Sequence, residues 1–150
     1  MKIISINAGS SSLKFCLFDM TDESVIASGI FERIGIEGSC YTIKFNGEKI
    51  TEEVLLETHL DAVKTLFDKL LILNIINSLD EIKGVGHRIV QGKDLYSESV
   101  LITDKVIEDL DNIKSFAPLH NPGALMAIKA FKEVLPEVLM SVVFDTAFHQ

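Results

Sequence analysis

A short segment near the start of the chain gathers the kinds of group that bind phosphate. Residues 7–14 read Asn-Ala-Gly-Ser-Ser-Ser-Leu-Lys, so hydroxyls, backbone amides and an ammonium group lie close together. Such groups form a good cradle for phosphate when a turn gathers them at its tip. The segment is not a P-loop, because the second glycine and the Lys-Ser/Thr ending are missing and residues 15–19 continue as a strand. A plain Gly/Ser turn between two strands is the alternative interpretation.

An arginine on a short strand is a candidate for binding a small organic acid. Strand alternation over residues 84–91 places Gly86, Arg88 and Val90 on one face. A guanidinium group can clamp a carboxylate while the neighbouring valine contacts a methyl group, which suits a very small acid. The alternative for Arg88 is a structural ion pair. On the opposite face, His87 is expected to be a packing histidine with satisfied hydrogen bonds rather than a ligand.

The loop over residues 116–122 brings a histidine to the start of a predicted helix. Leu119 and His120 precede this helix, whose positive end favours an anion nearby. His120 could therefore hydrogen-bond a phosphoryl group during its transfer, and Leu119 could line a pocket for an acyl group. A surface or capping role is the alternative for His120.

Asp145 lies at the end of the last apolar strand. Ligands of α/β sheets collect at the carboxyl ends of strands, so Asp145 is a candidate for chemistry there, with capping of the next turn as the alternative. Its spacing to His149 also invites a metal site that would include His120, but no second carboxylate or cysteine cluster supports one. The two cysteines, Cys16 and Cys40, lack zinc spacing and are expected to be buried free thiols.

Local patterns predict the elements that must position these residues. The first third of the chain alternates as strands do, and Asn46-Gly47 is a strong hairpin signal. After residue 56 the apolar period becomes helical, and both Thr103 and Asn121-Pro122 are typical of helix starts. The predicted strands are residues 2–8, 13–20, 24–33, 41–45, 48–56, 83–90 and 138–144, and the predicted helices are residues 60–73, a segment after 103 and a segment from 121 to 135.

This order of elements predicts an α/β architecture, in which helices pack on a mixed sheet. The chain of 150 residues fits one domain, and its net charge of −8 with scattered basic residues argues against a nucleic-acid surface. No apolar run approaches the roughly 18 residues of a membrane span, and the start lacks the features of a signal peptide. We therefore expect a cytoplasmic protein with no nucleic-acid or membrane partner. Because the chain stops soon after a buried strand, we expect it to be the first part of a longer protein.

Four segments of the chain resemble signatures of the acetate kinases. They are residues 5–15, 87–93, 117–122 and 144–150, which follow in the family's order and span the whole chain. Two residues depart from the family pattern. Gln91 stands where the family usually has histidine, and Lys93 stands where it has a glycine that can serve a positive φ.

The resemblance implies a fold and an activity. The acetate kinases belong to the superfamily of sugar kinases, actin and heat-shock chaperone ATPases. The implied fold is a ribonuclease H-like mixed sheet, with an antiparallel meander, then parallel strands, helices on the faces and an inserted β-hairpin. The implied reaction is reversible phosphoryl transfer from ATP to acetate with Mg²⁺, giving acetyl phosphate and ADP. Residues 1–150 would be the N-terminal domain, inactive alone, and a C-terminal nucleotide-binding domain would be absent; the complete protein would be a homodimer.

The resemblance also implies roles for particular residues. Acetate would be bound through its carboxylate by an arginine and through its methyl group by two apolar residues, while the other groups would handle phosphate and metal. The implied catalytic residues are Arg88, His120 and Asp145; Arg88, Val90 and Leu119 would bind acetate, Ser10, Ser12 and Lys14 the phosphates, and Asn7 and, through water, Asp145 the Mg²⁺. A propionate or other short-chain acyl kinase is the alternative within the enzyme class, and a non-catalytic binding or assembly module is the alternative outside it.

Overall fold

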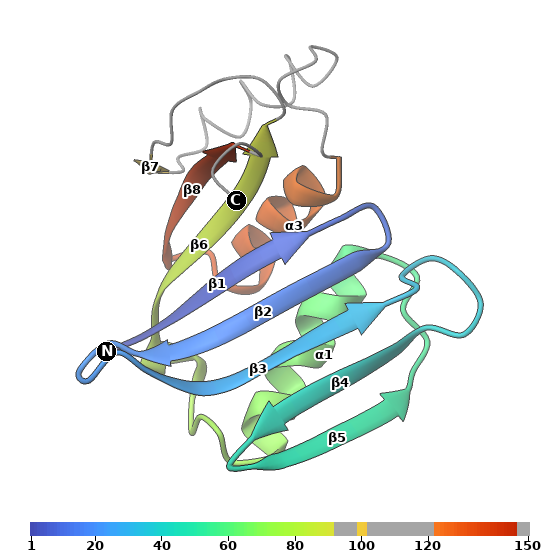
Figure 1. Ribbon diagram of the computed structural model, residues 1–150, viewed down its shortest axis with the longest axis horizontal. Helices are drawn as coiled ribbons and strands as arrows, with labels where there is room; N and C mark the ends of the chain where they lie inside the picture. The colour runs from blue at the N-terminus through green and yellow to red at the C-terminus, as the bar shows by residue number, and fades with distance from the viewer. Residues whose placement is uncertain (92–98, 102–121, 147–150) are drawn as a thin grey trace.

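The computed structural model describes residues 1–91, 99–101 and 122–146. Within these ranges the chain forms one eight-stranded sheet in the order β5-β4-β3-β2-β1-β6-β8-β7, with helices α1 and α3 packed against it (Figure 1). The elements are β1 (Lys2–Ala8), β2 (Ser12–Asp19), β3 (Ser24–Glu32), β4 (Cys40–Phe45), β5 (Glu48–Glu53), α1 (His59–Ile72), a single 3₁₀ turn η1 (Leu79–Glu81), β6 (Ile82–Gln91), β7 (Ser99–Leu101), α3 (Pro122–Val134) and β8 (Leu139–Thr146).

The first five strands form an antiparallel meander, as predicted. Each strand from β1 to β5 pairs antiparallel with the next one along the chain. The predicted hairpin at residues 46–47 is confirmed, with φ of 51° at Asn46 and 74° at Gly47. Two successive positive φ values give the turn that matches the twist of a two-residue hairpin. The hairpin strands β4 and β5 extend the same sheet at its edge, and β5 ends at Glu53 rather than at the predicted residue 56.

The second half of the sheet is parallel. β6 pairs parallel with both β1 and β8, so the predicted mixed sheet is confirmed. The sequence did not predict β7, which pairs antiparallel with β8, because three residues are too few to show a period. The helix predicted after residue 103 lies outside the described residues.

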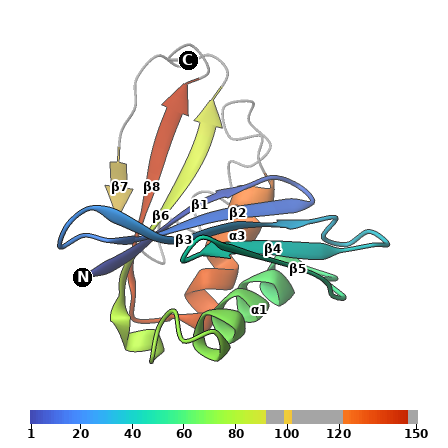
Figure 2. The same cartoon turned by 60° about the horizontal axis from the view of Figure 1, so that its bottom comes forward.

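The two described helices lie side by side on one face of the sheet (Figure 2). Thr58 caps α1, and its side chain and that of Asp61 form a reciprocal capping box. α3 begins at Pro122, as predicted. The rings of Phe67 and Phe131 meet edge-to-face with centroids 5.7 Å apart, so the helices share one core. Among the described residues, no helix has the length and apolar character needed to cross a bilayer.

Alternation along the strands separates a buried face from a polar face. On β1, Ile4, Ile6 and Ala8 face the helices and are at most 2% exposed. Ser5 and Asn7 point to the other side, which carries no helix within the described part of the chain (Figure 2). We call this second side the open face. The polar residues of the strands therefore gather on one surface.

His87 packs in the core, but its predicted hydrogen bonds are not found. Its side chain is 1% exposed and meets the ring of Phe131 edge-to-face, with centroids 5.4 Å apart. Neither ring nitrogen has a hydrogen-bond partner among the described residues, so the prediction of a satisfied histidine is wrong on this point. Strand pairing explains the difference, since His87 stands between the apolar residues Ile6 and Val142 on the neighbouring strands and packs on Phe131 of α3. Burial lowers the pKa of His87 from 6.5 to about 3.

The first prediction concerns the pH dependence of stability. Because the folded pKa of His87 lies below the unfolded one, protonation favours unfolding, so its contribution is present above pH 6.5 and is lost as the pH falls toward 3. Between about pH 7 and about pH 5 the free energy of unfolding should lose about 2 kcal/mol through this group. His87→Leu should remove this part of the loss. Denaturant unfolding of both proteins across this range measures it, and equal pH dependence would contradict the assignment.

Candidate active site

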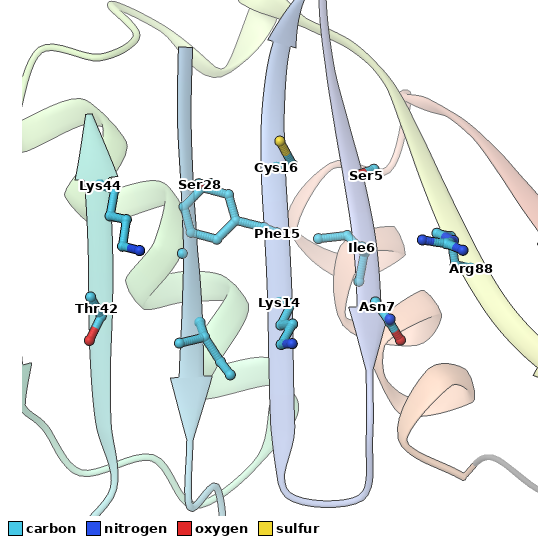
Figure 3. Close-up of a pocket in the computed structure, with 12 residues that line it drawn as sticks. Ser5, Ile6, Asn7, Lys14, Phe15, Cys16, Ser28, Thr42, Lys44 and Arg88 are labelled. Atoms are coloured by element: carbon cyan, nitrogen blue, oxygen red, sulfur yellow. The ribbon is translucent and has the colours of Figure 1, made fainter. Parts of the chain in front are cut away.

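Three polar residues that were predicted to bind metal, phosphate and acetate stand side by side on adjacent strands. Asn7 on β1 pairs with Lys14 on β2 and with Arg88 on β6. All three are exposed on the open face, and Figure 3 shows them at the end of the sheet nearest the β1–β2 turn. The predicted alternation of β6 is confirmed where side chains are described, because Val85 and His87 are buried while Arg88 is exposed.

These residues line a hollow with a strongly positive character. The hollow has a volume of about 460 Å³ and extends over the open face of five strands, from β6 to β4 (Figure 3). Among the described residues its lining contains the cationic side chains of Lys14, Lys44 and Arg88 but no carboxylate. This composition contrasts with the whole chain, in which 22 acidic residues outnumber 14 basic ones. A concave surface lined by one sign of charge concentrates ions of the opposite sign, so the hollow favours anions.

The β1–β2 turn lies directly beyond the pair Asn7–Lys14. The N–H of Gly9 donates to the carbonyl oxygen of Ser12 over 3.0 Å, which closes the turn. Ser10 is exposed and Ser12 is half-buried. Ser10 and Ser12 thus stand in the turn that leads into Lys14 on β2, where the predicted phosphate cradle would lie.

Two helices begin against this turn. The side chain of His59, the first residue of α1, lies with Nε2 2.8 Å from the carbonyl oxygen of Gly9. The second residue of α3, Gly123, lies so close that a Cβ placed there would be 1.9 Å from the same oxygen. Neither residue was predicted from the sequence, because nothing local marks a contact between segments so far apart in the chain.

The other predicted site residues are only partly placed. Val90 and Asp145 share one register position of the β6–β8 pair, two residues beyond the pair Arg88–Val143. The backbone of Asp145 therefore lies near that of Arg88, toward the carboxyl ends of the parallel strands β6 and β8. The structure does not describe the side chain of Asp145. Leu119 and His120 lie outside the described residues, as does Lys93, so their roles stay predictions.

By residue type, the two predicted metal ligands, Asn7 and Asp145, supply oxygen donors, which suit magnesium better than zinc. Within the described residues, no group of three or more His, Cys, Asp and Glu side chains could hold a metal ion. Magnesium does not need such a cage, because it keeps several waters and binds through one or two side-chain oxygens plus substrate phosphates. The amide oxygen of Asn7 and the carboxylate of Asp145 fit that donor set.

Several residues of the hollow were not predicted. Strand alternation from Asn7 and Lys14 could have indicated Ser5 and Cys16, since each lies two residues away on the same face. Ser28, Thr42 and Lys44 could not be found in this way, because their neighbourhood depends on the pairing of β2, β3 and β4. Cys16 and Cys40 are free, as predicted, but both are only half-buried where burial was predicted, since neither side chain faces the helix layer. Partial burial raises the pKa of the Cys16 thiol.

Comparison with known proteins finds similarity along almost the whole chain. Residues 2–150 match the sequence profile of the Acetokinase family. The acetate kinase of Bacillus subtilis (strain 168) is 56% identical over 149 residues, which are 99% of this chain and 38% of that protein. A solved acetate kinase from Porphyromonas gingivalis superposes with a TM-score of 0.86 at 39% identity, covering 98% of this chain and 38% of its own. A solved propionate kinase from Francisella tularensis gives a TM-score of 0.82 at 32% identity, with coverages of 99% and 38%. The chain thus spans about 38% of the length of the curated relatives it matches.

The second prediction concerns the contact between α3 and the turn. Gly123→Ala would place a Cβ 1.9 Å from the oxygen and 2.3 Å from the carbon of the Gly9 carbonyl, so the backbone must shift. We expect the free energy of unfolding to fall by about 1–3 kcal/mol, as overpacking usually costs. Gly84→Ala is the matched control, because its Cβ would meet nothing nearer than 3.6 Å. Urea unfolding of both variants measures the difference, and equal effects would argue against the contact.

Proposed function

The chain belongs to the acetokinase family, and we propose that it is the N-terminal, acetate- and phosphate-binding domain of an acetate kinase. The complete enzyme would transfer a phosphoryl group reversibly from ATP to acetate, giving acetyl phosphate and ADP. The observation that carries the proposal is the placement of Asn7, Lys14 and Arg88 side by side on the open face. This arrangement offers a carboxylate site and a phosphate site next to each other, as direct transfer between the two substrates requires.

In this proposal Arg88 binds the carboxylate of acetate. Its guanidinium can donate two hydrogen bonds to one carboxylate. Val90, two residues along β6, and Leu119 would contact the methyl group. The nucleophile needs no general base, because a simple carboxylic acid with a pKa of roughly 4–5 is already ionised at neutral pH.

The phosphoryl group would lie between Arg88 and the β1–β2 turn. Lys14 and the hydroxyls of Ser10 and Ser12 are the proposed ligands of the ATP phosphates. His120 would stabilise the phosphoryl group during its transfer. Phosphoryl transfer depends mainly on positioning and on charge stabilisation, so a cluster of donors and cations on a rigid sheet is what the reaction needs.

Magnesium is the metal that the proposed site would hold. Asn7 and, through water, Asp145 are its proposed protein ligands, and the ion would neutralise charge on the phosphates. Since acetate has no proton to give, Asp145 serves the metal rather than acting as a base.

The remainder of the protein would complete the site. The chain spans 38% of its curated relatives, which supports a further domain after residue 150 that binds the nucleotide. We also propose that the complete protein is a cytoplasmic homodimer, with its subunit interface outside this chain. Propionate is the second candidate substrate, favoured by the similarity to a solved propionate kinase. One methylene group changes selectivity by only about 1–3 kcal/mol, so both acids could be accepted.

The third prediction tests the activity itself. A hydroxamate assay for acyl phosphate should detect ATP-dependent product with acetate in the full-length protein, and less with propionate. Residues 1–150 alone should give no product, because the nucleotide domain is missing. A full-length protein inactive with every short acid would instead favour a binding or assembly module, and an active fragment would refute the division into domains.

The fourth prediction concerns Arg88. Removing a charge-assisted hydrogen bond of about 1.5–3 kcal/mol should raise the KM for acetate, or lower kcat/KM, by roughly 10- to 150-fold in Arg88→Ala. The KM for ATP should hardly change. Lys44→Ala is the matched control, since it removes a cation from the far side of the same hollow and should leave acetate kinetics nearly unchanged. A loss of ATP affinity with normal acetate kinetics would assign Arg88 to the nucleotide.

A further inference from the structure

The orientation of one peptide group in the β1–β2 turn is set by a side chain from α1. His59 is only 2% exposed, and its Nε2 lies 2.8 Å from the carbonyl oxygen of Gly9. A carbonyl oxygen can only accept, so Nε2 must carry the proton and donate it. The bond joins residues separated by fifty positions in the chain.

The bond has a consequence for the next amide group. In a planar trans peptide, the C=O of Gly9 and the N–H of Ser10 point in opposite directions. Because His59 holds the carbonyl toward the start of α1, the N–H of Ser10 is turned away from α1. Among the described residues, the backbone N–H groups of Ser10 and Ser11 have no hydrogen-bond acceptor, so they remain available to a ligand.

Neighbouring contacts restrict the orientation of the Gly9–Ser10 peptide group. Gly123 packs directly on the Gly9–Ser10 peptide from the side of α3. At the other end of the turn, the carbonyl oxygen of Ser11 accepts the N–H of Ile34 over 2.9 Å. Two carbonyl groups of the turn are thus bonded to the protein. A phosphate would be repelled by free carbonyl oxygens and attracted by free amides, so this arrangement suits an anion.

His59 is not needed to start its own helix. Thr58 accepts a hydrogen bond from the N–H of Asp61, and the Asp61 carboxylate accepts the N–H of Thr58, so the cap of α1 is complete without the imidazole. A buried imidazole aimed at one carbonyl oxygen therefore serves the turn rather than the helix.

We propose that His59 is a positioning residue for phosphoryl transfer: by holding the Gly9 carbonyl it aims the Ser10 N–H at the transferred group. This inference rests on the proposed kinase function and adds to it a residue outside the hollow. It assigns the backbone of the turn, in addition to its hydroxyls, to the binding of phosphate.

The fifth prediction compares two variants of the full-length protein, in which His59 is replaced by Gln or by Asn. The side-chain nitrogen of Gln lies where Nε2 of histidine does and can donate to Gly9, whereas that of Asn is one carbon too short. We expect His59→Asn to lower kcat by roughly 10- to 100-fold, less than the roughly 100- to 1,000-fold cost of losing a donor outright, because the Ser10 N–H is misaimed and not removed. The KM for acetate should change by less than about twofold. His59→Gln should keep most of kcat. The hydroxamate assay with acetate and ATP provides both constants.

Thr58→Ala is the matched structural control, since it removes the cap of α1 but leaves the imidazole in place. It should lower the Tm by a few degrees and leave kcat unchanged. The positioning role is overturned if the Asn variant keeps its kcat, if Gln and Asn are equally impaired, or if Thr58→Ala lowers kcat as much as Asn does. An unaltered protein without acyl kinase activity would refute the proposed function, and the role of His59 with it.

Discussion

The candidate site depends on the backbone pairing that holds β1 between β2 and β6. β1 is antiparallel to β2 and parallel to β6, so Asn7 has Lys14 on one side and Arg88 on the other. Neighbouring strands lie about 4.8 Å apart, which brings the three side chains within reach of one small ligand. A slip of one residue in either pairing would move the side chain of Asn7, Lys14 or Arg88 from the open face to the buried face of the sheet. The buried side chains of Ile6 and Ala8 oppose such a slip, since it would expose them.

The same alternation builds the core and the site. On β1 and β2 the buried apolar residues face α1 and α3, and Ser5, Asn7, Lys14 and Cys16 lie on the open face. Neighbours on β6 show the consequence most sharply, because Arg88 is exposed where a ligand can reach it while His87 is 1% exposed beside Phe131. The exposure of the arginine and the low pKa of the histidine both follow from one strand that has a helix layer on a single side.

The β1–β2 turn obtains its shape from distant segments. His59 holds the Gly9 carbonyl, Ile34 holds that of Ser11, and the missing side chain of Gly123 lets α3 approach the backbone. Short turns rich in glycine and serine have many conformations of similar energy, so outside contacts must select one of them. In this protein the two helices that bury the core also support the turn, which links the stability of the domain to the geometry of the proposed phosphate site.

The sequence by itself determined the elements and the kinds of chemistry. Period, caps and turn residues are local, so the hairpin at 46–47, the start of α3 and the strand nature of residues 15–19 were predictable, and so were Asn7, Lys14 and Arg88 as candidates. The tertiary structure decided which residues meet: the register of β1 with β6, the contribution of Lys44 to the hollow, the isolation of His87 from hydrogen-bond partners among the described residues, and the contact of His59 with Gly9. These contacts join positions far apart in the chain. They depend on how the strands pair and how the helices pack, and no local pattern of residues encodes that.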